Sequence, residues 1–359
     1  MKITLVFFGF LAINLASSSK IFKIAIDLES GKEQNVEVVE LDQPQEIVDE
    51  QEEIETDSFN IFLKTFNIQL ENYEMRQKIF TKNYRKIRHH NERFYKGLET
   101  FEMAVNKFTH LTEIERKNFI SQIHPREATN FSIPIYKVKF DDSELASSVN
   151  WVEKNKLQPI QDQGQCESCY AFAAIATIES QMIIRYNNWE KLSEQEAMEC
   201  TKGCKGGLSQ DIYLYSQVHG GCASENSYPY YGHEVNDCNA AQNRKRVSNS
   251  KCTGILEFGT SVEATMKAIE QFGPITAYMA IYNSFYNYNN GIYKRTQNDD
   301  EIQGYHAVTF VGYGQENGLD YWLVRNSWGK HWGQNGYAKF LKGTDECEIE
   351  SLNHYGPQL

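Results

Sequence analysis

Apolar residues recur every three or four positions between residues 58 and 91, which is the spacing of an amphipathic helix. They form two groups: Phe59, Phe62, Leu63, Phe66 and Leu70, and then Ile79, Phe80 and Ile87. Asp57 and Ser58 are suitable N-cap residues for the first group. The pattern predicts two long helices, or one bent helix, over this region.

The helical periodicity is lost between residues 122 and 145, where proline and polar residues indicate an extended linker. The linker contains Asn130-Phe131-Ser132, which makes Asn130 a candidate N-glycosylation site. Beyond Trp151, a Cys- and Gly-rich half is followed by strand-like runs at residues 307–311 and 321–324. We therefore expect an α-leaning lobe followed by a β-leaning lobe.

The N-terminus has the features of a secretory signal peptide. Lys2 precedes an apolar stretch at residues 3–15, and small residues follow at positions 16–18. No later segment approaches the roughly 20 apolar residues of a transmembrane helix. We expect a signal peptide over residues 1–18 and a soluble, secreted protein that folds in an oxidising compartment.

The formal net charge of −12 argues against nonspecific nucleic-acid binding, which requires a basic surface. Part of this charge is local, because residues 46–57 carry seven acidic side chains and no Lys or Arg. Such a composition usually stays solvated. We expect residues 19–57 to form an acidic spacer.

Cys169 directly precedes an Ala-rich run, residues 171–179, that favours a helix. At a helix N-terminus the backbone dipole and the unpaired amides favour an anion and lower the pKa of a thiol. The thiolate is the form that attacks a carbonyl carbon. Cys169 is therefore the candidate nucleophile.

A thiolate mechanism also requires a group that protonates the leaving amine, and His306 is the best-placed histidine. It stands in a Gly-Tyr-His-Ala turn before an apolar strand, and within the roughly 130–150 residues after the cysteine that are typical of papain-like enzymes. Asn326 follows 20 residues later and can orient the imidazole, while Trp328 can shield that hydrogen bond from water.

These segments resemble the papain family of cysteine peptidases in order and spacing. The matching runs are those around Cys169, residues 204–207, 305–307, 311–314 and 326–329. The resemblance implies an α+β, papain-like two-lobed fold, with a helical left lobe and an antiparallel β-barrel right lobe, preceded by a helical inhibitory propeptide. It also implies that Gln163 and the Cys169 amide form the oxyanion hole, and it requires no metal or other cofactor.

The upstream region resembles the family's inhibitory propeptide. Arg76, Phe80, Asn83, Ile87 and Asn91 fit its helical signature, with Asn72 at a position usually held by Glu. Residues 104–110 fit its second signature, with His110 at a position usually held by Asp. The expected domains are a propeptide at 58–121, an extended linker at 122–145 cut somewhere in 139–146, and a mature peptidase at 146–359.

The resemblance implies that substrate binds along residues that line a cleft. In the expected pocket for P2, the second residue before the scissile bond, Leu352 at the base offers no carboxylate, so we expect an apolar P2 residue. The expected substrate-binding residues are Glu167, Tyr170, Gly206, Gly207, Leu208, Ser209, Tyr278, Ala307, Trp328 and Leu352. Partners would be protein or peptide substrates, the chain's own propeptide and cystatin-type inhibitors.

Two departures from the family pattern suggest specific hypotheses. Glu167 replaces a Gly beside the nucleophile, so it favours Lys or Arg before the scissile bond, or else is a solvated charge that raises the Cys169 pKa. His110 gains charge on acidification and would loosen the propeptide near pH 5–6, or else has no role.

Cysteine pairing is settled only in part. The resemblance implies disulfides Cys166–Cys204 and Cys200–Cys238, whereas Cys222 and Cys252 could pair with each other or one of them with Cys347. A redox Cys166-x-x-Cys169 pair and a zinc cage are weaker alternatives in this context.

Other functional classes are weaker alternatives. A catalytically weak homologue that acts as a binding protein would have Glu167 and Tyr170 as its only support, and no insertion that would cap the cleft for exopeptidase activity is evident. Within the family the chain is nearest to mite cysteine-protease allergens. We expect secretion outside the cell, for example into a gut lumen, or delivery to lysosomes or endosomes.

Overall fold

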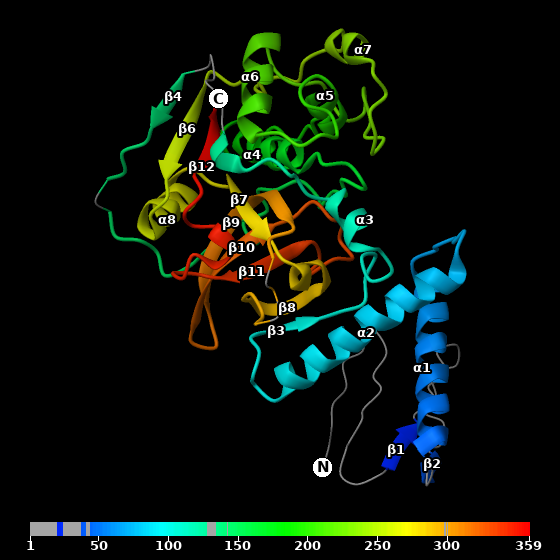
Figure 1. Cartoon of the computed structure of the whole chain (residues 1–359). Helices are drawn as coiled ribbons and strands as arrows, with labels where there is room; N and C mark the ends of the chain where they lie inside the picture. The colour runs from blue at the N-terminus through cyan, green and yellow to red at the C-terminus, as the bar shows by residue number, and fades with distance from the viewer. Residues whose placement is uncertain are drawn as a thin grey trace. The chain divides into compact units, whose positions relative to one another are not determined.

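Figure 1 shows the computed structural model of the chain, which divides into two compact units, residues 1–71 and 72–359. The described residues are 20–23, 37–40, 44–127, 134–141, 143–297, 299 and 301–359. The predicted signal peptide and the candidate glycosylation site Asn130 lie outside the described residues.

The first unit contains a long helix that begins earlier than the apolar pattern predicts. Two short strands, β1 (Lys20–Lys23) and β2 (Glu37–Glu40), pair antiparallel, and helix α1 spans Pro44–Thr65. The prediction of a helix start at Ser58 was therefore wrong. Pro near the first helical position and acidic residues in the first turns both favour an earlier start.

The second unit begins with the rest of the propeptide, and its long helix α2 (Tyr73–Tyr95) is separate from α1. Asn72, the departure from the helical signature, is the N-cap of α2, and its side chain accepts from Met75 N at 3.3 Å. Phe80 and Ile87 are buried. The further elements are β3 (Phe101–Met103), α3 (Glu113–Lys117), the 3₁₀ turn η1 (Pro125–Glu127) and β4 (Ile135–Lys137).

The signature residues of α2 hold the chain that follows the helix. Asn83 Nδ2 donates to Thr109 O at 2.9 Å, and Asn91 exchanges two hydrogen bonds with the Met103 backbone. Because these contacts join the helix to residues 101–110, the two propeptide signatures form one structure. This structure packs on the β-rich lobe, where β3 pairs with β8.

The helical lobe is built around α4, a helix buried over most of its length. Fifteen of its residues, from Cys169 to Ile183, are buried, as expected from a run rich in Ala and Ile. The lobe contains α4 (Cys169–Tyr186), α5 (Glu194–Glu199), α6 (Ser209–His219) and α7 (Cys238–Gln242).

The β-rich lobe is a mainly antiparallel sheet in the order β3-β8-β11-β10-β9-β7-β12-β6-β4, with β5 paired to β9. Only β11 with β8 and β4 with β6 pair parallel among the described strands. Its remaining elements are β5 (Val149–Asn150), β6 (Gly254–Gly259), α8 (Val262–Gln271), β7 (Ile275–Ile281), η2 (Asn283–Asn287), β8 (Tyr288–Tyr293), β9 (Gly304–Glu316), β10 (Leu319–Arg325), β11 (Tyr337–Leu341), η3 (Glu346–Glu348) and β12 (His354–Gln358).

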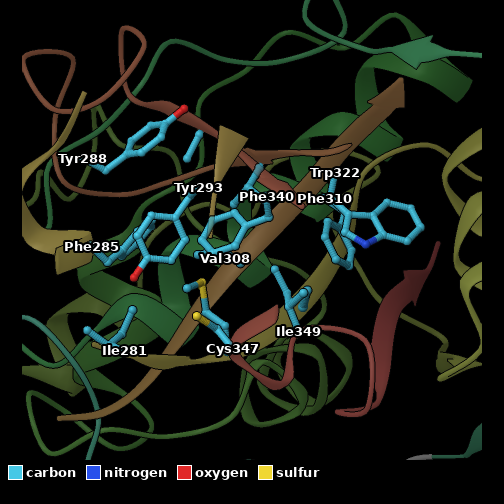
Figure 2. Packing of buried hydrophobic residues seen from close by; sticks show 14 of the residues in the cluster. Ile281, Phe285, Tyr288, Tyr293, Val308, Phe310, Trp322, Phe340, Cys347 and Ile349 are labelled. Atoms are coloured by element: carbon cyan, nitrogen blue, oxygen red, sulfur yellow. The ribbon is translucent and has the colours of Figure 1, made fainter. Parts of the chain in front are cut away.

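Aromatic side chains fill the core of this lobe, as Figure 2 shows. Phe285 packs within 5.1 Å, between ring centroids, of both Tyr293 and Phe340. Cys347 lies in the same core, whereas Cys222 and Cys252 lie in the core around α4. All three are free thiols, so neither alternative is formed: Cys222 and Cys252 do not pair with each other, and neither of them pairs with Cys347.

Candidate active site

Cys169 is the first residue of α4 and lies almost fully buried. The preceding residue, Ser168, is the N-cap but makes no capping hydrogen bond with its side chain. Its hydroxyl instead pairs with Tyr230 Oη at 2.8 Å. The amides of the first turn are therefore not capped by Ser168, and they face the region of the thiol.

His306 and Asn326 form the predicted pair. His306 lies on β9 opposite Met279 of β7, and Asn326 directly follows β10. His306 Nε2 donates to Asn326 Oδ1 at 2.8 Å, and Ser327 N donates to the same oxygen at 2.7 Å. Because two donors face this atom, it is the amide oxygen, and the neutral imidazole leaves Nδ1 unprotonated. His306 Nδ1 has no hydrogen-bond partner within the described residues.

Trp328 covers the His306–Asn326 pair. The His306 and Trp328 rings lie 4.8 Å apart, and the indole is buried. On its other side the indole stacks on Tyr286 at 5.4 Å and contacts Phe108 of the propeptide at 4.9 Å. This packing excludes water from the hydrogen bond that orients the imidazole.

Gln163 is fully buried and its amide is fixed at both ends. Ser327 Oγ donates to Gln163 Oε1 at 2.6 Å, which directs Nε2 toward the cleft. Nε2 donates to Cys166 O at 2.8 Å and to Phe119 O at 3.1 Å. A carbonyl of the propeptide therefore occupies the donor that was predicted to stabilise the oxyanion.

The propeptide continues along the cleft beyond Phe119. Ser121 pairs with Tyr305, the neighbour of His306, through two backbone hydrogen bonds of 2.7 Å. On the opposite wall a Cβ added to Gly206 would collide with the Ser121 hydroxyl. Residues 119–122 thus lie between the two walls and block access to Cys169 and His306.

Burial keeps both reacting groups neutral in this form. It raises the pKa of the Cys169 thiol to about 12, although hydrogen bonds from the Ala307 and Tyr170 backbone act in the opposite direction. It lowers the pKa of His306 to about 4, despite the bond to Asn326. The lowered thiol pKa expected from the helix N-terminus is therefore not found while the propeptide covers the site, because desolvation outweighs the helix dipole.

Comparison with known proteins matches most of this chain. Residues 145–356 match the sequence profile of the papain family cysteine protease, and residues 59–115 match the cathepsin propeptide inhibitor domain (I29). The chain belongs to the papain family of cysteine proteases. It is a cysteine endopeptidase with cathepsin L-like relatives, and its α+β fold is the expected papain-like proenzyme fold.

Individual relatives align with most of the length of this chain. Procathepsin L of Mus musculus is 35% identical over 297 residues, which are 79% of this chain and 85% of that protein. The digestive procathepsin L2 proteinase from Tenebrio molitor larval midgut superimposes with a TM-score of 0.75 at 28% identity, covering 85% of this chain and 100% of that one. A structure from work on the mite allergens Blo t 1 and Der p 1 matches with a TM-score of 0.68 at 28% identity, covering 84% and 98%.

The residues expected around P2 come together in one cluster of the protease. Leu208, Tyr278, Ala307 and Leu352 all belong to the apolar core around α4, and Tyr278 lies opposite Ala307 in the β7–β9 register. Tyr278 Oη accepts from Ser209 N at 2.8 Å. The phenol is therefore fixed within this cluster.

Tyr170 lies behind the cleft wall. It is fully buried, and its hydroxyl donates to Gly203 O at 3.0 Å. Its ring lies against Gly207, where a Cβ would come within 3.0 Å. The structure thus places Tyr170 as a support for the 203–207 loop.

The protease contains the two disulfides implied by the resemblance, Cys166–Cys204 and Cys200–Cys238. Because Cys166 bonds to Cys204, the alternatives of a Cys166/Cys169 redox pair and a zinc cage are wrong. No group of His, Cys, Asp and Glu side chains within the described residues could hold a metal ion. None of the helices in the described part of the chain is long and apolar enough to cross a membrane.

His110 is less basic than predicted. Burial and the neighbouring Arg76 and Arg116 lower its pKa to about 4, below the pH 5–6 window that its sequence position suggested. Arg76 itself is paired with Glu115, whose carboxyl pKa falls to about 2.

Sequence reasoning missed the role of two groups. Ser327 fixes the Gln163 amide, and its only signal was its place between Asn326 and Trp328. Residues 119–122 form the blocking strand, and they span the boundary between the expected propeptide domain and the expected linker. The sequence predicted no contact of these particular residues with Gln163 or Tyr305.

Proposed function

We propose that the chain is a secreted zymogen that hydrolyses peptide bonds through Cys169, His306, Asn326 and Gln163. The observation that carries this proposal is the His306 Nε2 bond to Asn326 Oδ1, which leaves Nδ1 unpartnered beside the start of α4. A nucleophile, a base and an orienting amide in this order are the elements of covalent catalysis.

The mechanism follows from the positions of these groups. Once the propeptide leaves and water enters, the helix N-terminus and His306 favour the ion pair of thiolate and imidazolium. Cys169 Sγ attacks the peptide carbonyl, and Gln163 Nε2 with the Cys169 amide stabilises the negative oxygen. His306 protonates the leaving amine and then activates the water that hydrolyses the thioester.

The contacts that the propeptide makes in the cleft support intramolecular inhibition, which proteolysis would relieve. Phe119 O takes the place of a substrate carbonyl at Gln163, and Lys107 of the propeptide bridges to both carboxylate oxygens of Asp162 at 2.7 Å. Activation therefore requires that residues 107–122 detach from the cleft.

We expect an apolar residue at P2, because the side chains gathered around Tyr278 and Leu352 carry no charge. The two disulfides and the apolar N-terminus support secretion, since disulfides persist in oxidising compartments. The name of the Tenebrio relative, a digestive procathepsin L2 proteinase, supports a digestive role outside cells, with lysosomal or endosomal delivery as the alternative. Cystatin-type inhibitors would compete for the same cleft.

The proposal is tested with purified zymogen activated at acid pH. Wild type should hydrolyse peptides with Leu or Val at P2, and Cys169→Ser should show no measurable turnover while it retains the fold. A catalytically weak homologue would instead bind such peptides and release them uncleaved. Equal turnover by wild type and Cys169→Ser would contradict the proposed nucleophile.

A further inference from the structure

Glu167 places a carboxylate in the wall of the cleft, two residues before the nucleophile. Its Oε2 lies 3.3 Å from the position that a Cβ on Gly206 would take. The same position is contacted by Ser121 of the blocking strand. The carboxylate therefore borders the channel that a substrate backbone would follow.

Within the described residues no cation pairs with this carboxylate, and Glu167 takes part in no ion pair. The side chain is half-buried, and burial raises its pKa. A partly desolvated carboxylate without a counter-ion is unfavourable, so a cationic side chain of a substrate would stabilise it.

The distance along the blocking strand shows which substrate residue lies near Glu167. Phe119 O occupies the Gln163 donor, and Ser121, two residues later, lies beside the Gly206 position that Glu167 Oε2 also borders. Two residues of extended chain span at most about 7 Å. A long side chain on the residue whose carbonyl occupies the Gln163 donor can therefore reach the carboxylate.

We propose that Glu167 selects substrates with Lys or Arg at P1, the residue directly before the scissile bond, by forming an ion pair with that side chain. The inference rests on the proposed function, because it assumes that the scissile carbonyl binds at Gln163. A planar guanidinium can bond both carboxylate oxygens, so Arg should be preferred to Lys.

The test compares peptides that share one apolar P2 residue and differ only at P1: Arg, Lys, citrulline, which has the shape of Arg without its charge, and Glu. Wild type should cleave the Arg peptide with a kcat/KM at least about 10-fold above that of the citrulline peptide, the effect of one charge-assisted hydrogen bond. Glu167→Gln should lose this ratio, and Glu167→Lys should favour Glu at P1.

Glu153→Gln is the matched control, because it removes the same charge from an exposed position of the mature domain and should keep the wild-type ratio. Active sites are counted by titration with a covalent cysteine inhibitor. A poorly folded variant then has fewer active sites, but its Arg-to-citrulline ratio of kcat/KM stays the same. An Arg-to-citrulline ratio that is the same in wild type and Glu167→Gln would overturn the inference. Failure of wild type to cleave any of the peptides would contradict the proposed function instead.

Discussion

Cys169 and His306 carry opposite pKa shifts that share one cause. Burial disfavours the charged form of each group, so the thiol becomes less acidic and the imidazole less basic. Both shifts oppose the ion pair that catalysis needs. Residues 119–122 of the propeptide fill the cleft, and burial keeps both reacting groups neutral in this form.

At Gln163 the fixed amide should stabilise the oxyanion. Gln163→Ala removes one preorganised donor, which typically costs on the order of 2.7–4 kcal/mol in the transition state. We expect kcat of the activated enzyme to fall about 100- to 1000-fold with little change in KM. Steady-state kinetics with one good peptide substrate measure this, and Gln158→Ala, which removes an exposed amide that donates to Trp189 O, is the control. An unchanged kcat would show that Gln163 does not touch the reacting carbonyl.

Tyr278 should limit the size of the P2 residue. Its phenol is held by Ser209 N and donates to Gln210 Oε1 at 2.7 Å, so it cannot swing away without leaving buried polar groups unpaired. Wild type should prefer Val or Leu to Phe at P2, and Tyr278→Ala should shift kcat/KM toward Phe by about 10-fold or more. A P2 profile that is unchanged in Tyr278→Ala, or a wild-type preference for Arg at P2, would contradict this account.

At the scale of elements, buried His90 and half-buried His110 should make the propeptide sensitive to acid. Burial lowers the pKa of His90, and burial together with Arg76 and Arg116 lowers that of His110 to about 4. The folded propeptide therefore resists protons that an unfolded one accepts. Its fold loses stability as pH falls below the ordinary histidine pKa, and for His110 the loss continues to about pH 4. Glu115, whose pKa is about 2, stays charged throughout this window.

Replacing these histidines should shift autoprocessing to lower pH. His90→Gln and His110→Gln cannot take up a proton, so each should require more acid before the propeptide detaches. The onset of processing is followed on gels across a pH series, and exposed His89→Gln, one position from His90, is the control. If both variants process at the wild-type pH, protonation of His90 and His110 does not trigger processing.

The linker contains a peptide bond, between Lys139 and Phe140, whose preceding residues fit the expected P2 and P1 preferences. Val138 is apolar and Lys139 is exposed, whereas Phe140 packs against Phe258 and Phe272 of the mature domain. The sequence Val-Lys would meet the P2 preference and the Glu167 site, and Phe140 would stay anchored after cleavage. We expect the mature chain to begin at Phe140.

N-terminal sequencing of the acid-processed protein tests this boundary. Lys139→Gln should move the first residue or slow processing, and Lys137→Gln, in β4, should do neither. A mature N-terminus that starts at the same residue in wild type and Lys139→Gln, and is formed at the same rate, would exclude this bond.

For the whole molecule, motifs predicted the site better than periodicity predicted the fold. Cys169, His306 and Asn326 were predicted because each chemical role demands a particular residue type at a particular spacing, whereas Gln163 was implied by the family resemblance. The start of α1 was missed because charged residues of the acidic segment carry no apolar periodicity, although they form helices well.

Protonation and burial could not be derived from local sequence. The helix N-terminus behind Cys169 was identified correctly, but its effect on the thiol is outweighed by burial, which local sequence does not show. The separation of Cys347 from Cys222 and Cys252 likewise depends on which core each enters. Such properties follow from tertiary contacts.

The central claim is that Cys169 is a reactive nucleophile that the propeptide masks. It is tested most directly by treating zymogen and acid-processed enzyme with an epoxide inhibitor of cysteine peptidases and locating the adduct by peptide mass spectrometry. We predict labelling of Cys169 in the processed enzyme and none in the intact zymogen at neutral pH, with Cys222, Cys252 and Cys347 unmodified in both. Equal labelling of Cys169 before and after processing, or labelling of another cysteine in its place, would contradict the account.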